Sequence, residues 1–215
     1  MEHEAFLTTL REVVTLPDPQ AEKLWEFFGV FAGTAEKLNL TGLKDPADRA
    51  KKLFIDSLTP LKFCDFSKIK SALDLGTGGG FPGIPLAIAL PNVKFTLVDS
   101  TRKKVDAVNQ MIEKLQLKNA TALWKRSEQL VKEKKTFEVV FAKAVANLLP
   151  LLHFALPLVQ KNGTLVAFLG PHEDAHNIEA GQVLRKYRAK IVQDHRYALP
   201  GETDERHIAV FTRPR

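Results

Sequence analysis

The 215-residue sequence predicts an α/β fold in which a mostly parallel β-sheet carries helices on both faces. Two observations lead to this prediction. From residue 71 onward, short apolar runs typical of strands alternate with segments of helical period. Residues 1–65 lack that alternation and show helical periodicity instead. The sequence therefore predicts an N-terminal helical extension over residues 1–65 and an α/β domain over residues 66–215.

Three helices are expected in the extension. The first places Phe6 and Leu10 on one apolar stripe. The second and third each begin with an Asp-Pro pair, in which Asp18 and Asp45 are expected to cap the helix while the proline occupies its first turn. A polar break at residues 39–42 separates these two helices.

Seven strands are expected in the domain, and the last two follow each other without a helix. We therefore expect an antiparallel pair at the end of an otherwise parallel sheet. The expected strands cover residues 71–76, 93–100, 120–125, 136–145, 163–170, 190–199 and 206–213. The expected helices of the domain cover residues 81–90, 101–117, 147–160 and 173–188.

Basic residues are concentrated in the second part of the chain. The whole sequence has a net charge of +6, yet residues 1–70 contain 10 Lys and Arg against 11 Asp and Glu. Residues 71–215 contain 21 Lys and Arg against 14 Asp and Glu. A basic domain suggests a polyanionic partner, of which nucleic acid is the first candidate. A basic surface that serves only solubility is the open alternative.

Composition argues against membrane-spanning and disulfide-bonded classes. The longest apolar run, residues 146–159, contains prolines and a histidine and is too short to cross a membrane. The first ten residues are acidic and lack the apolar block of a signal peptide. Cys64 is the single cysteine, which excludes an internal disulfide and a cysteine-rich metal site. The expected compartment is the cytoplasm.

The stretch DLGTGGGFPGIPLAI, residues 74–88, joins the first expected strand to the next helix. In a doubly wound sheet such a loop lies where nucleotide-like ligands bind, and its glycines let the backbone approach the ligand. One register of the loop, Gly78, Gly80 and Gly83, matches the fingerprint of dinucleotide-binding proteins. Asp99 follows at the end of the second strand, as that fingerprint requires. An NAD-dependent oxidoreductase is therefore one hypothesis.

A second register begins at Asp74 and continues with alternating glycines from Gly76 to Gly80, a pattern typical of S-adenosylmethionine-dependent methyltransferases. Pro82 and Pro85 favour this register, because they remove N–H groups that a pyrophosphate needs at a helix N-terminus. S-adenosylmethionine has no phosphate. Its amino group is expected near Asp74, and its ribose hydroxyls near the carboxylate that ends the second strand.

The sequence lacks the motifs of several methyltransferase classes. The segment after the fourth expected strand, FAKAVANLL, has no Pro-Pro-aromatic motif for methylation of exocyclic amines. Cys64 lies between Phe63 and Phe66 and is expected to be packed rather than nucleophilic. His172 and His176 have no third ligand, so no metal site is expected. Guanine N7 remains as an acceptor because its lone pair attacks without deprotonation, and no catalytic residue is assigned.

Several segments together resemble one family, the bacterial small-subunit ribosomal RNA methyltransferases called RsmG or GidB. The resemblance covers about residues 37–170, and the run of glycines followed by F-P-G-x-P is its most specific part. The segments that carry it are NLTGLKDP, FIDSL, ALDLGTGGGFPGIPLAI, FTLVDSTRKKVDAVNQ, RSEQL and FAKAVANLLPLL.

The resemblance implies a Rossmann-like class I methyltransferase fold, S-adenosylmethionine as cofactor, and methylation of a guanine N7 in 16S ribosomal RNA. The expected partner is 16S RNA or the small ribosomal subunit. A monomer is expected, because no spare apolar helix face is obvious. An RNA-binding module that has lost methyl transfer is the alternative, and it rests on the two departures from the family pattern described next.

Cofactor contacts are expected on the glycine loop and after the second, third and fourth strands. At Lys143 the family usually has arginine, so the charge is kept but the bidentate fork is lost. At Leu53 relatives commonly have histidine. Phe81 has core packing as the alternative to a role in the site. Asp56 and Ser57 have helix capping as the alternative, and for this pair capping is favoured. The expected cofactor residues are Asp74, Gly76, Gly78, Phe81, Asp99, Ser100, Thr101, Ser127, Glu128 and Lys143.

Two basic groups are expected near the proposed site. One opens the helix after the second strand, where lysines oppose the helix dipole and a phosphate contact would explain them. A solvated face is the open alternative, and the run KEKK at residues 132–135 is expected to be a solvated loop. The candidate RNA-binding residues are Lys44, Arg49, Lys51, Lys52, Arg102, Lys103 and Lys104.

Overall fold

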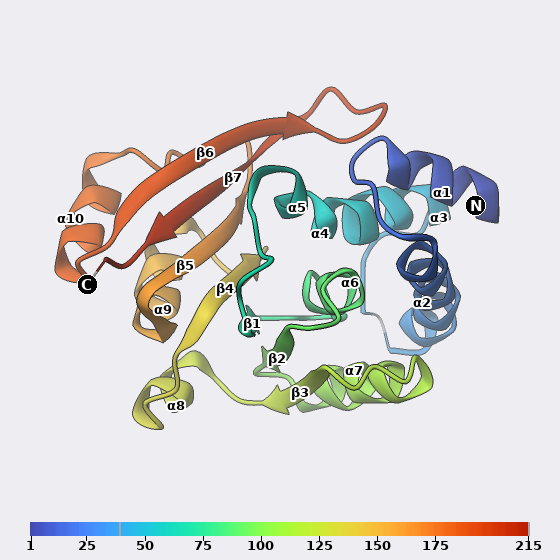
Figure 1. Ribbon diagram of the computed structural model, residues 1–215, viewed down its shortest axis with the longest axis horizontal. Helices are drawn as coiled ribbons and strands as arrows, with labels where there is room; N and C mark the ends of the chain where they lie inside the picture. The colour runs from blue at the N-terminus through green and yellow to red at the C-terminus, as the bar shows by residue number, and fades with distance from the viewer. Residues whose placement is uncertain (39, 215) are drawn as a thin grey trace.

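The computed structural model describes residues 1–38 and 40–214, and a seven-stranded sheet forms its centre (Figure 1). The strands lie in the order β3-β2-β1-β4-β5-β7-β6. Strands β1 to β5 run parallel to one another, whereas β7 runs antiparallel to β5 and to β6. The predicted seven-stranded, mostly parallel sheet is therefore confirmed. Its strands are β1 (Ser71–Leu75), β2 (Lys94–Asp99), β3 (Ala120–Trp124), β4 (Phe137–Lys143), β5 (Val159–Leu169), β6 (Lys190–Ala198) and β7 (Glu205–Thr212).

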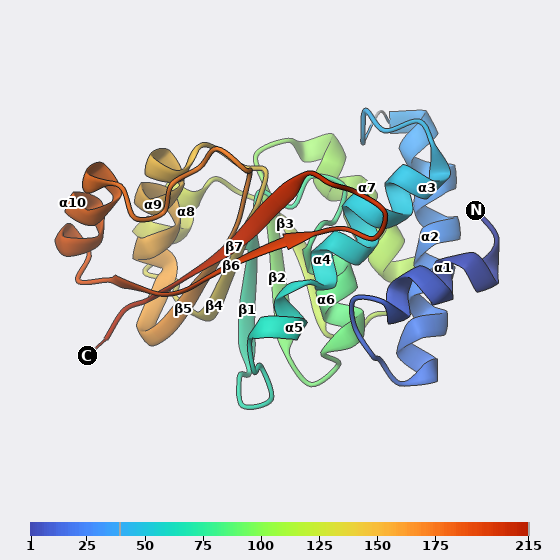
Figure 2. The same cartoon turned by 90° about the horizontal axis from the view of Figure 1, so that it is seen from above.

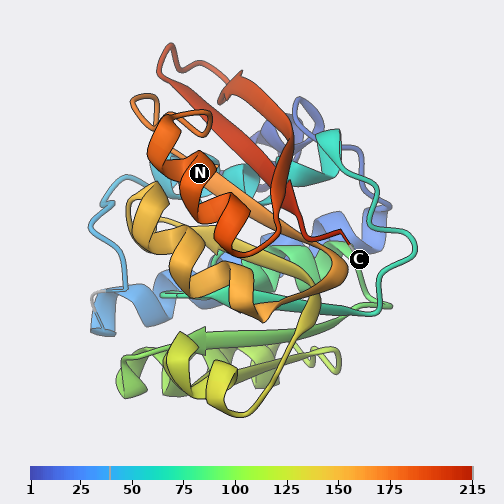
Figure 3. The same ribbon diagram turned by 90° about the vertical axis from the view of Figure 1, so that its left-hand side faces the viewer.

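Helices cover both faces of this sheet (Figures 2 and 3). One face carries α2, α6 and α7, and the other carries α8, α9 and α10. The α-helices are α1 (His3–Arg11), α2 (Asp18–Leu38), α3 (Pro46–Arg49), α4 (Asp56–Leu58), α5 (Pro60–Phe63), α6 (Gly83–Ala89), α7 (Arg102–Lys114), α8 (Ser127–Lys132), α9 (Leu148–Ala155) and α10 (Ile178–Lys186). A π-helical segment, η1 (Ala50–Ile55), joins α3 to α4, and a 3₁₀ turn, η2 (Leu156–Leu158), follows α9.

Alternate residues of the central strands fill two apolar cores. In β4, Val139 and Phe141 face the core beneath α2, α6 and α7, whereas Val140 and Ala142 face the core beneath α8, α9 and α10. This period of two is expected for a strand that is buried on both faces. Because the strands are parallel, the loops after β1, β2, β3 and β4 meet at one edge of the sheet, where ligands of doubly wound folds bind.

A cluster of aromatic rings joins the N-terminal helices to the loop after β1. The ring of Phe54 lies 4.8 Å from that of Phe27 and 4.9 Å from that of Phe81, measured between centroids. Phe81 is therefore packed in the core, and it also lines a hollow described below. The helical extension shares one apolar core with the sheet, and the domain boundary near residue 65 stays a prediction.

β5 and α8 differ from the expectation, because tertiary pairing extends β5 and a local hydrogen bond caps the start of α8. β5 begins at Val159 rather than near residue 163, since Val159 pairs with Phe137 of β4 ahead of the regular ladder. The preceding helix is correspondingly shorter. α8 was not expected, and it begins where the side chain of Gln129 accepts a hydrogen bond from the backbone N–H of Arg126, at 2.8 Å.

The expected third helix is present but is not a regular α-helix throughout. As predicted, the carboxylate of Asp45 caps its start by accepting a hydrogen bond from the N–H of Asp48, at 2.9 Å. α2 differs, because Asp18 is its first residue rather than a residue that precedes it. Asn39, in the polar break between the two helices, lies outside the described residues.

Candidate functional site

The loop between β1 and α6 is shaped by glycines in left-handed backbone conformations. Gly76, Gly78 and Gly80 have φ angles of +74°, +56° and +98°. A Cβ atom at Gly76 would lie 2.8 Å from Cγ2 of Val145, so the close approach of the loop after β4 also requires glycine there. The N–H groups of Gly76 and Thr77 both donate to the carbonyl of Val98, at 2.9 Å, which fixes the loop against β2.

At the start of α6, each backbone N–H group already donates a hydrogen bond within the protein, and the proline there has no N–H group. Gly83 donates to Oδ2 of Asp74 at 2.8 Å, and Ile84 donates to the carbonyl of Gly80 at 2.8 Å. Pro85 has no N–H group. This helix start therefore offers no free donors to a phosphate, in contrast to the helix that follows the dinucleotide fingerprint.

Asp74 lies beneath the loop and does not line the hollow in front of it. Its side chain has 0% exposure, and only Oδ2 has a hydrogen-bond partner among the described residues. A Cβ atom at Gly83 would lie 2.6 Å from this oxygen, so glycine is required for the contact. Burial raises the pKa of Asp74 to about 7, although the neighbouring Thr77 hydroxyl and the Gly83 N–H oppose the shift. Asp74 positions the loop, and the structure does not bring it to the wall where a cofactor amino group was expected.

Two adjoining hollows open in front of the loop. The glycine-loop hollow, of about 370 Å³, lies between the loop, the start of α7 and Lys143. The β3-side hollow, of about 270 Å³, lies between the end of β2 and the start of α8. Both are bordered by Gly76, Asp99, Ser100 and Val145, so they form one continuous surface.

Asp99 is the central polar side chain of this surface. Its carboxylate accepts hydrogen bonds from the N–H groups of Gly78, at 2.9 Å, and Thr101, at 2.8 Å, and its side chain is largely buried. A carboxylate has about four lone-pair sites, so two amide bonds leave it able to accept from ligand hydroxyls. These bonds hold Asp99 in place at the junction of the two hollows.

Most predicted cofactor residues meet at this surface. The side chain of Ser127 donates to Glu128 at 3.1 Å, and the backbone N–H of Glu128 together with this hydroxyl lowers the pKa of the Glu128 carboxyl. The predicted residues that line the glycine-loop hollow are Gly76, Gly78, Phe81, Asp99, Ser100, Thr101 and Lys143, and those that line the β3-side hollow are Gly76, Asp99, Ser100, Ser127 and Glu128.

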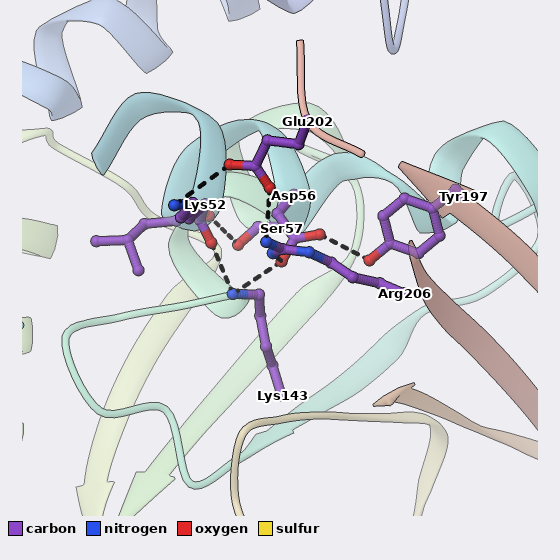
Figure 4. Close-up of polar contacts among 8 residues, drawn as sticks. Lys52, Asp56, Ser57, Lys143, Tyr197, Glu202 and Arg206 are labelled. Atoms are coloured by element: carbon purple, nitrogen blue, oxygen red, sulfur yellow. Dashed lines mark hydrogen bonds and ion pairs between the residues drawn. The ribbon is translucent and has the colours of Figure 1, made fainter. Parts of the chain in front are cut away.

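A buried ion cluster, drawn in Figure 4, borders the glycine-loop hollow through Lys143. The carboxylate of Asp56, 3% exposed, accepts a hydrogen bond from the hydroxyl of Tyr197 at 2.7 Å. Its other oxygen lies 3.1 Å from Nζ of Lys143 and 3.5 Å from Nη1 of Arg206. Burial and the neighbouring carboxylate raise the pKa of Tyr197 well above its ordinary value. The expectation that Asp56 caps a helix is wrong, because the residue lies within a continuous helical run and pairs with three distant side chains.

Lys143 is held from two sides. Besides Asp56, its ammonium group donates to the carbonyl of Lys52 at 2.9 Å. The hydroxyl of Ser57 donates to the carbonyl of Leu53, so it too bonds within its own helix rather than capping one. No local sequence signal connects Asp56 with Tyr197 and Arg206, which explains why those two residues were absent from the predicted site.

The predicted RNA-binding residues separate into two groups. Arg102 and Lys103 are exposed at the start of α7, and Lys104 lines the glycine-loop hollow. In the second group several side chains have partners inside the protein: Lys52 lies 3.4 Å from carboxylates of both Asp48 and Glu202, and Arg49 donates to the carbonyl of Leu43 at 2.7 Å. Lys51 is half-buried and Lys44 is exposed.

Neither a metal cluster nor a membrane span is found in the part of the chain that the structure describes. No group of three or more His, Cys, Asp and Glu there has the geometry to hold a metal ion. None of its helices is long and apolar enough to cross a membrane. Nε2 of the exposed His176 lies 3.5 Å from Oδ2 of Asp194.

The raised pKa of Asp74 predicts a pH dependence of stability. The folded pKa of about 7 exceeds the ordinary 3.8, so the stabilising contribution of Asp74 is complete below about pH 4 and is lost as the pH rises to about 7. The free energy of unfolding of the wild type, relative to Asp74→Asn, is expected to fall by up to about 4 kcal/mol over this range. Urea unfolding at a series of pH values measures this difference.

Asp65→Asn is the matched control, because the N–H of Ser67 lowers the pKa of Asp65. The free energy of unfolding of the wild type, relative to Asp65→Asn, should change only below about pH 4. There it should rise with pH, whereas the value relative to Asp74→Asn falls with pH. Parallel pH profiles for the wild type and Asp74→Asn would contradict the prediction.

The sequence is similar to a family of ribosomal RNA methyltransferases. The sequence model of the GidB family, described as rRNA small subunit methyltransferase G, matches residues 20–208. A protein of Oceanobacillus iheyensis named ribosomal RNA small subunit methyltransferase G is 33% identical over 220 residues, which cover 100% of this chain and 92% of the relative. A protein of the same name from Macrococcus caseolyticus is 34% identical over 211 residues, covering 97% and 89% of the two chains.

Solved structures confirm the Rossmann-like class I methyltransferase fold. A ribosomal protein L11 methylase from Lactobacillus delbrueckii superposes with a TM-score of 0.55 and 14% identity, covering 76% of this chain and 80% of that chain. M. jannaschii TYW2, in complex with AdoMet, superposes with a TM-score of 0.56 and 12% identity, covering 74% and 76%. The family match over residues 20–208 and the relatives of 33–34% identity over nearly the whole chain show that the chain belongs to the GidB family of rRNA small subunit methyltransferases.

Proposed function

We propose that this protein transfers the methyl group of S-adenosylmethionine to N7 of a guanine in 16S ribosomal RNA. Its family membership and the names of its relatives support the substrate class. The substrate is free 16S RNA or the small ribosomal subunit, and the protein acts as a monomer in the cytoplasm. The basic second part of the chain, with 21 Lys and Arg against 14 Asp and Glu, fits an RNA partner.

One observation carries the choice of cofactor: the start of α6 has no free N–H groups. A dinucleotide would place its pyrophosphate there and would find no donors. S-adenosylmethionine needs none at this point, because it has no phosphate. The Asp74 contact and the two prolines therefore favour the methyltransferase interpretation of the glycine loop over the oxidoreductase interpretation.

The residues around the two hollows fit the parts of this cofactor. Asp99 accepts hydrogen bonds from the ribose hydroxyls, and Ser127 with Glu128 borders the adenine. The backbone of Gly76, Gly78, Ser100 and Thr101 and the ring of Phe81 form the walls. Lys143 closes the glycine-loop hollow on the side of the ion cluster, and Asp74 acts from beneath by holding the loop. The cofactor, when bound, supplies a methyl group activated by its sulfonium.

Guanine N7 suits this site because it requires no general base. Its in-plane lone pair attacks the methyl carbon directly, so the protein contributes alignment and electrostatic stabilisation rather than proton transfer. The carboxylates at the two hollows are consistent with the absence of a general base. Asp99 already accepts two amide hydrogen bonds, and the lowered pKa of Glu128 makes it a weak base.

The start of α7 provides the RNA-binding face beside the hollows. Arg102 and Lys103 are exposed there, and the guanidinium of Arg102 lies 5.6 Å from the ring centre of the exposed Trp124. The indole N–H of Trp124 donates to the carbonyl of Ser100 at 2.9 Å, which fixes the ring next to the cofactor surface. Exposed cations with an aromatic ring are the groups that bind phosphates and unstacked bases of RNA.

The proposed activity is tested by incubating the protein and S-adenosylmethionine carrying a labelled methyl group with small subunits, or with their RNA, from cells that lack this modification. Digestion and mass spectrometry should show labelled N7-methylguanine in the 16S RNA. In parallel, calorimetry should show binding of S-adenosylhomocysteine and none of NAD. Folded protein that binds the cofactor but labels neither substrate form would instead support an RNA-binding module without methyl transfer.

Asp99→Asn is expected to weaken binding of S-adenosylhomocysteine by about 10- to 100-fold. The reason is the loss of a charge-assisted hydrogen bond to ribose, worth about 1.5–3 kcal/mol. Isothermal titration calorimetry measures the change. Asp106→Asn, an exposed site on α7 whose carboxylate lies 3.9 Å from Arg102, is the control and should bind as the wild type does. Equal affinity of Asp99→Asn and the wild type would remove Asp99 from the proposed cofactor site.

Replacing Arg102 and Lys103 together by alanine is expected to raise the KM for RNA and to leave cofactor affinity unchanged. The slope of log affinity against log salt concentration should become shallower by about 0.7–0.9 for each phosphate that the variant no longer neutralises. Lys132→Ala with Lys135→Ala removes the same charge beside the amino end of β4, away from the hollows, and should change neither quantity. The same salt slope for both double variants would show that the start of α7 does not bind RNA.

A further inference from the structure

A third hollow adjoins the glycine-loop hollow. This hairpin hollow, of about 340 Å³, lies between the ends of β4 and β5 and the C-terminal hairpin of β6 and β7. Lys143 and Ala144 line both hollows, so one short wall separates the two spaces. A group in the hairpin hollow would therefore lie next to a ligand in the glycine-loop hollow.

The hairpin hollow has more carboxylates than cations, in a protein whose net charge is +6. Asp56, Asp204 and Glu205 line it, against Lys143 and Arg206. Such a site disfavours a phosphate and suits a group that carries hydrogen-bond donors and gains positive charge. The buried ring of Phe168 and the half-buried ring of Tyr197 add flat apolar surface, which suits a planar ligand.

Asp204 is the carboxylate of this hollow that has no partner in the part of the chain described. The carboxylate of Asp56 binds Tyr197 and the two cations, and that of Glu205 lies 3.4 Å from Arg196. No hydrogen bond or ion pair of the Asp204 side chain occurs among the described residues. The loop that carries it is held in place by Glu202, which lies 3.4 Å from Lys52 and 2.9 Å from Arg206.

We propose that the hairpin hollow binds the target guanine base, with the carboxylate of Asp204 accepting hydrogen bonds from its N1–H and 2-amino groups. This assignment rests on the proposed function. A bidentate acceptor matches the two adjacent donors on that edge of guanine, and no other base presents both. The ammonium of Lys143, on the shared wall, is placed to meet O6, the acceptor adjacent to N7, which turns N7 toward the glycine-loop hollow.

The charge of the hollow also suits the reaction. The N7 lone pair forms the new bond to the methyl carbon, and the electrons of the broken sulfur–methyl bond remain on sulfur. The positive charge passes from the sulfonium to the guanine ring, and no proton is released. An excess of fixed carboxylates around the base stabilises this charge as it develops. The phosphate backbone stays outside, on the basic start of α7, so base and backbone meet surfaces of opposite charge.

The test compares Asp204→Asn with the wild type on small subunits reconstituted with either guanine or inosine at the target position, since inosine lacks the 2-amino group. The wild type should methylate the guanine substrate with a higher kcat/KM than the inosine substrate. Asp204→Asn should lower kcat/KM for guanine about tenfold and should reduce the guanine-to-inosine ratio, with unchanged affinity for S-adenosylhomocysteine. Asp204→Ser, which also removes the carboxylate from this exposed loop position, should behave in the same way.

Glu113→Gln is the control, because Glu113 is exposed near the far end of α7 and lines none of the three hollows. It should leave kcat/KM and the guanine-to-inosine ratio unchanged. If both Asp204 variants fold, bind the cofactor and keep the wild-type ratio, the base site is overturned while the proposed function stands. If the wild type makes no N7-methylguanine on any substrate, the proposed function is overturned, and this assignment with it.

Discussion

A carboxylate removed from water must be paired or protonated, and the geometry of the site depends on how Asp56 is paired. Its two oxygens bind Tyr197 from β6, Lys143 from β4 and Arg206 from β7, while its own backbone belongs to the N-terminal helices. Removing one partner would leave charge buried without compensation, at a cost of several kcal/mol. The cluster therefore ties the helical extension, the parallel strands and the C-terminal hairpin together at one point, and its Lys143 lies on the wall shared by the glycine-loop hollow and the hairpin hollow.

A second buried carboxylate organises the other side of the site. Asp74 binds the N–H of Gly83 and fixes the glycine loop against the start of α6. The same contact removes a donor that a phosphate would need, so the interaction that shapes the loop also narrows the choice of cofactor. The hydrogen bond from Gly83 to Asp74 therefore both shapes the loop and disfavours a phosphate-containing cofactor.

Basic and acidic side chains lie on different parts of the surface around the hollows. The start of α7 is basic, while the hairpin hollow has an excess of carboxylates. Under the proposed methylation of guanine N7 this division has a simple physical use, because RNA phosphates are anionic whereas a guanine methylated at N7 is cationic. A uniformly basic site would bind the backbone well but would oppose the charge that the reaction creates.

The sequence by itself determined the order of the seven strands along the chain, the glycine loop and the acidic residue Asp99 at the end of β2. These features follow from local rules: the periods of strands and helices, the conformational freedom of glycine and the missing N–H of proline. Local rules alone pointed to Asp74, Gly76, Gly78 and Asp99 as candidates for a ligand site. The other candidates came from the family resemblance, and they lie in or next to the loops after β1 to β4, which consecutive parallel strands bring to one edge of the sheet.

Only the tertiary structure decided which polar side chains are buried and what they bind. Nothing near Asp56 in the sequence indicates Tyr197 or Arg206, which lie 141 and 150 residues away, and a local interpretation made Asp56 a helix cap. Asp74 was expected to face a ligand, but it is buried beneath the loop, where it accepts a hydrogen bond from Gly83 at the start of α6. β5 begins earlier than its apolar pattern suggests, because pairing with β4 outweighs local preference. Burial and pairing are properties of the folded chain, and they depend on contacts between residues far apart in sequence.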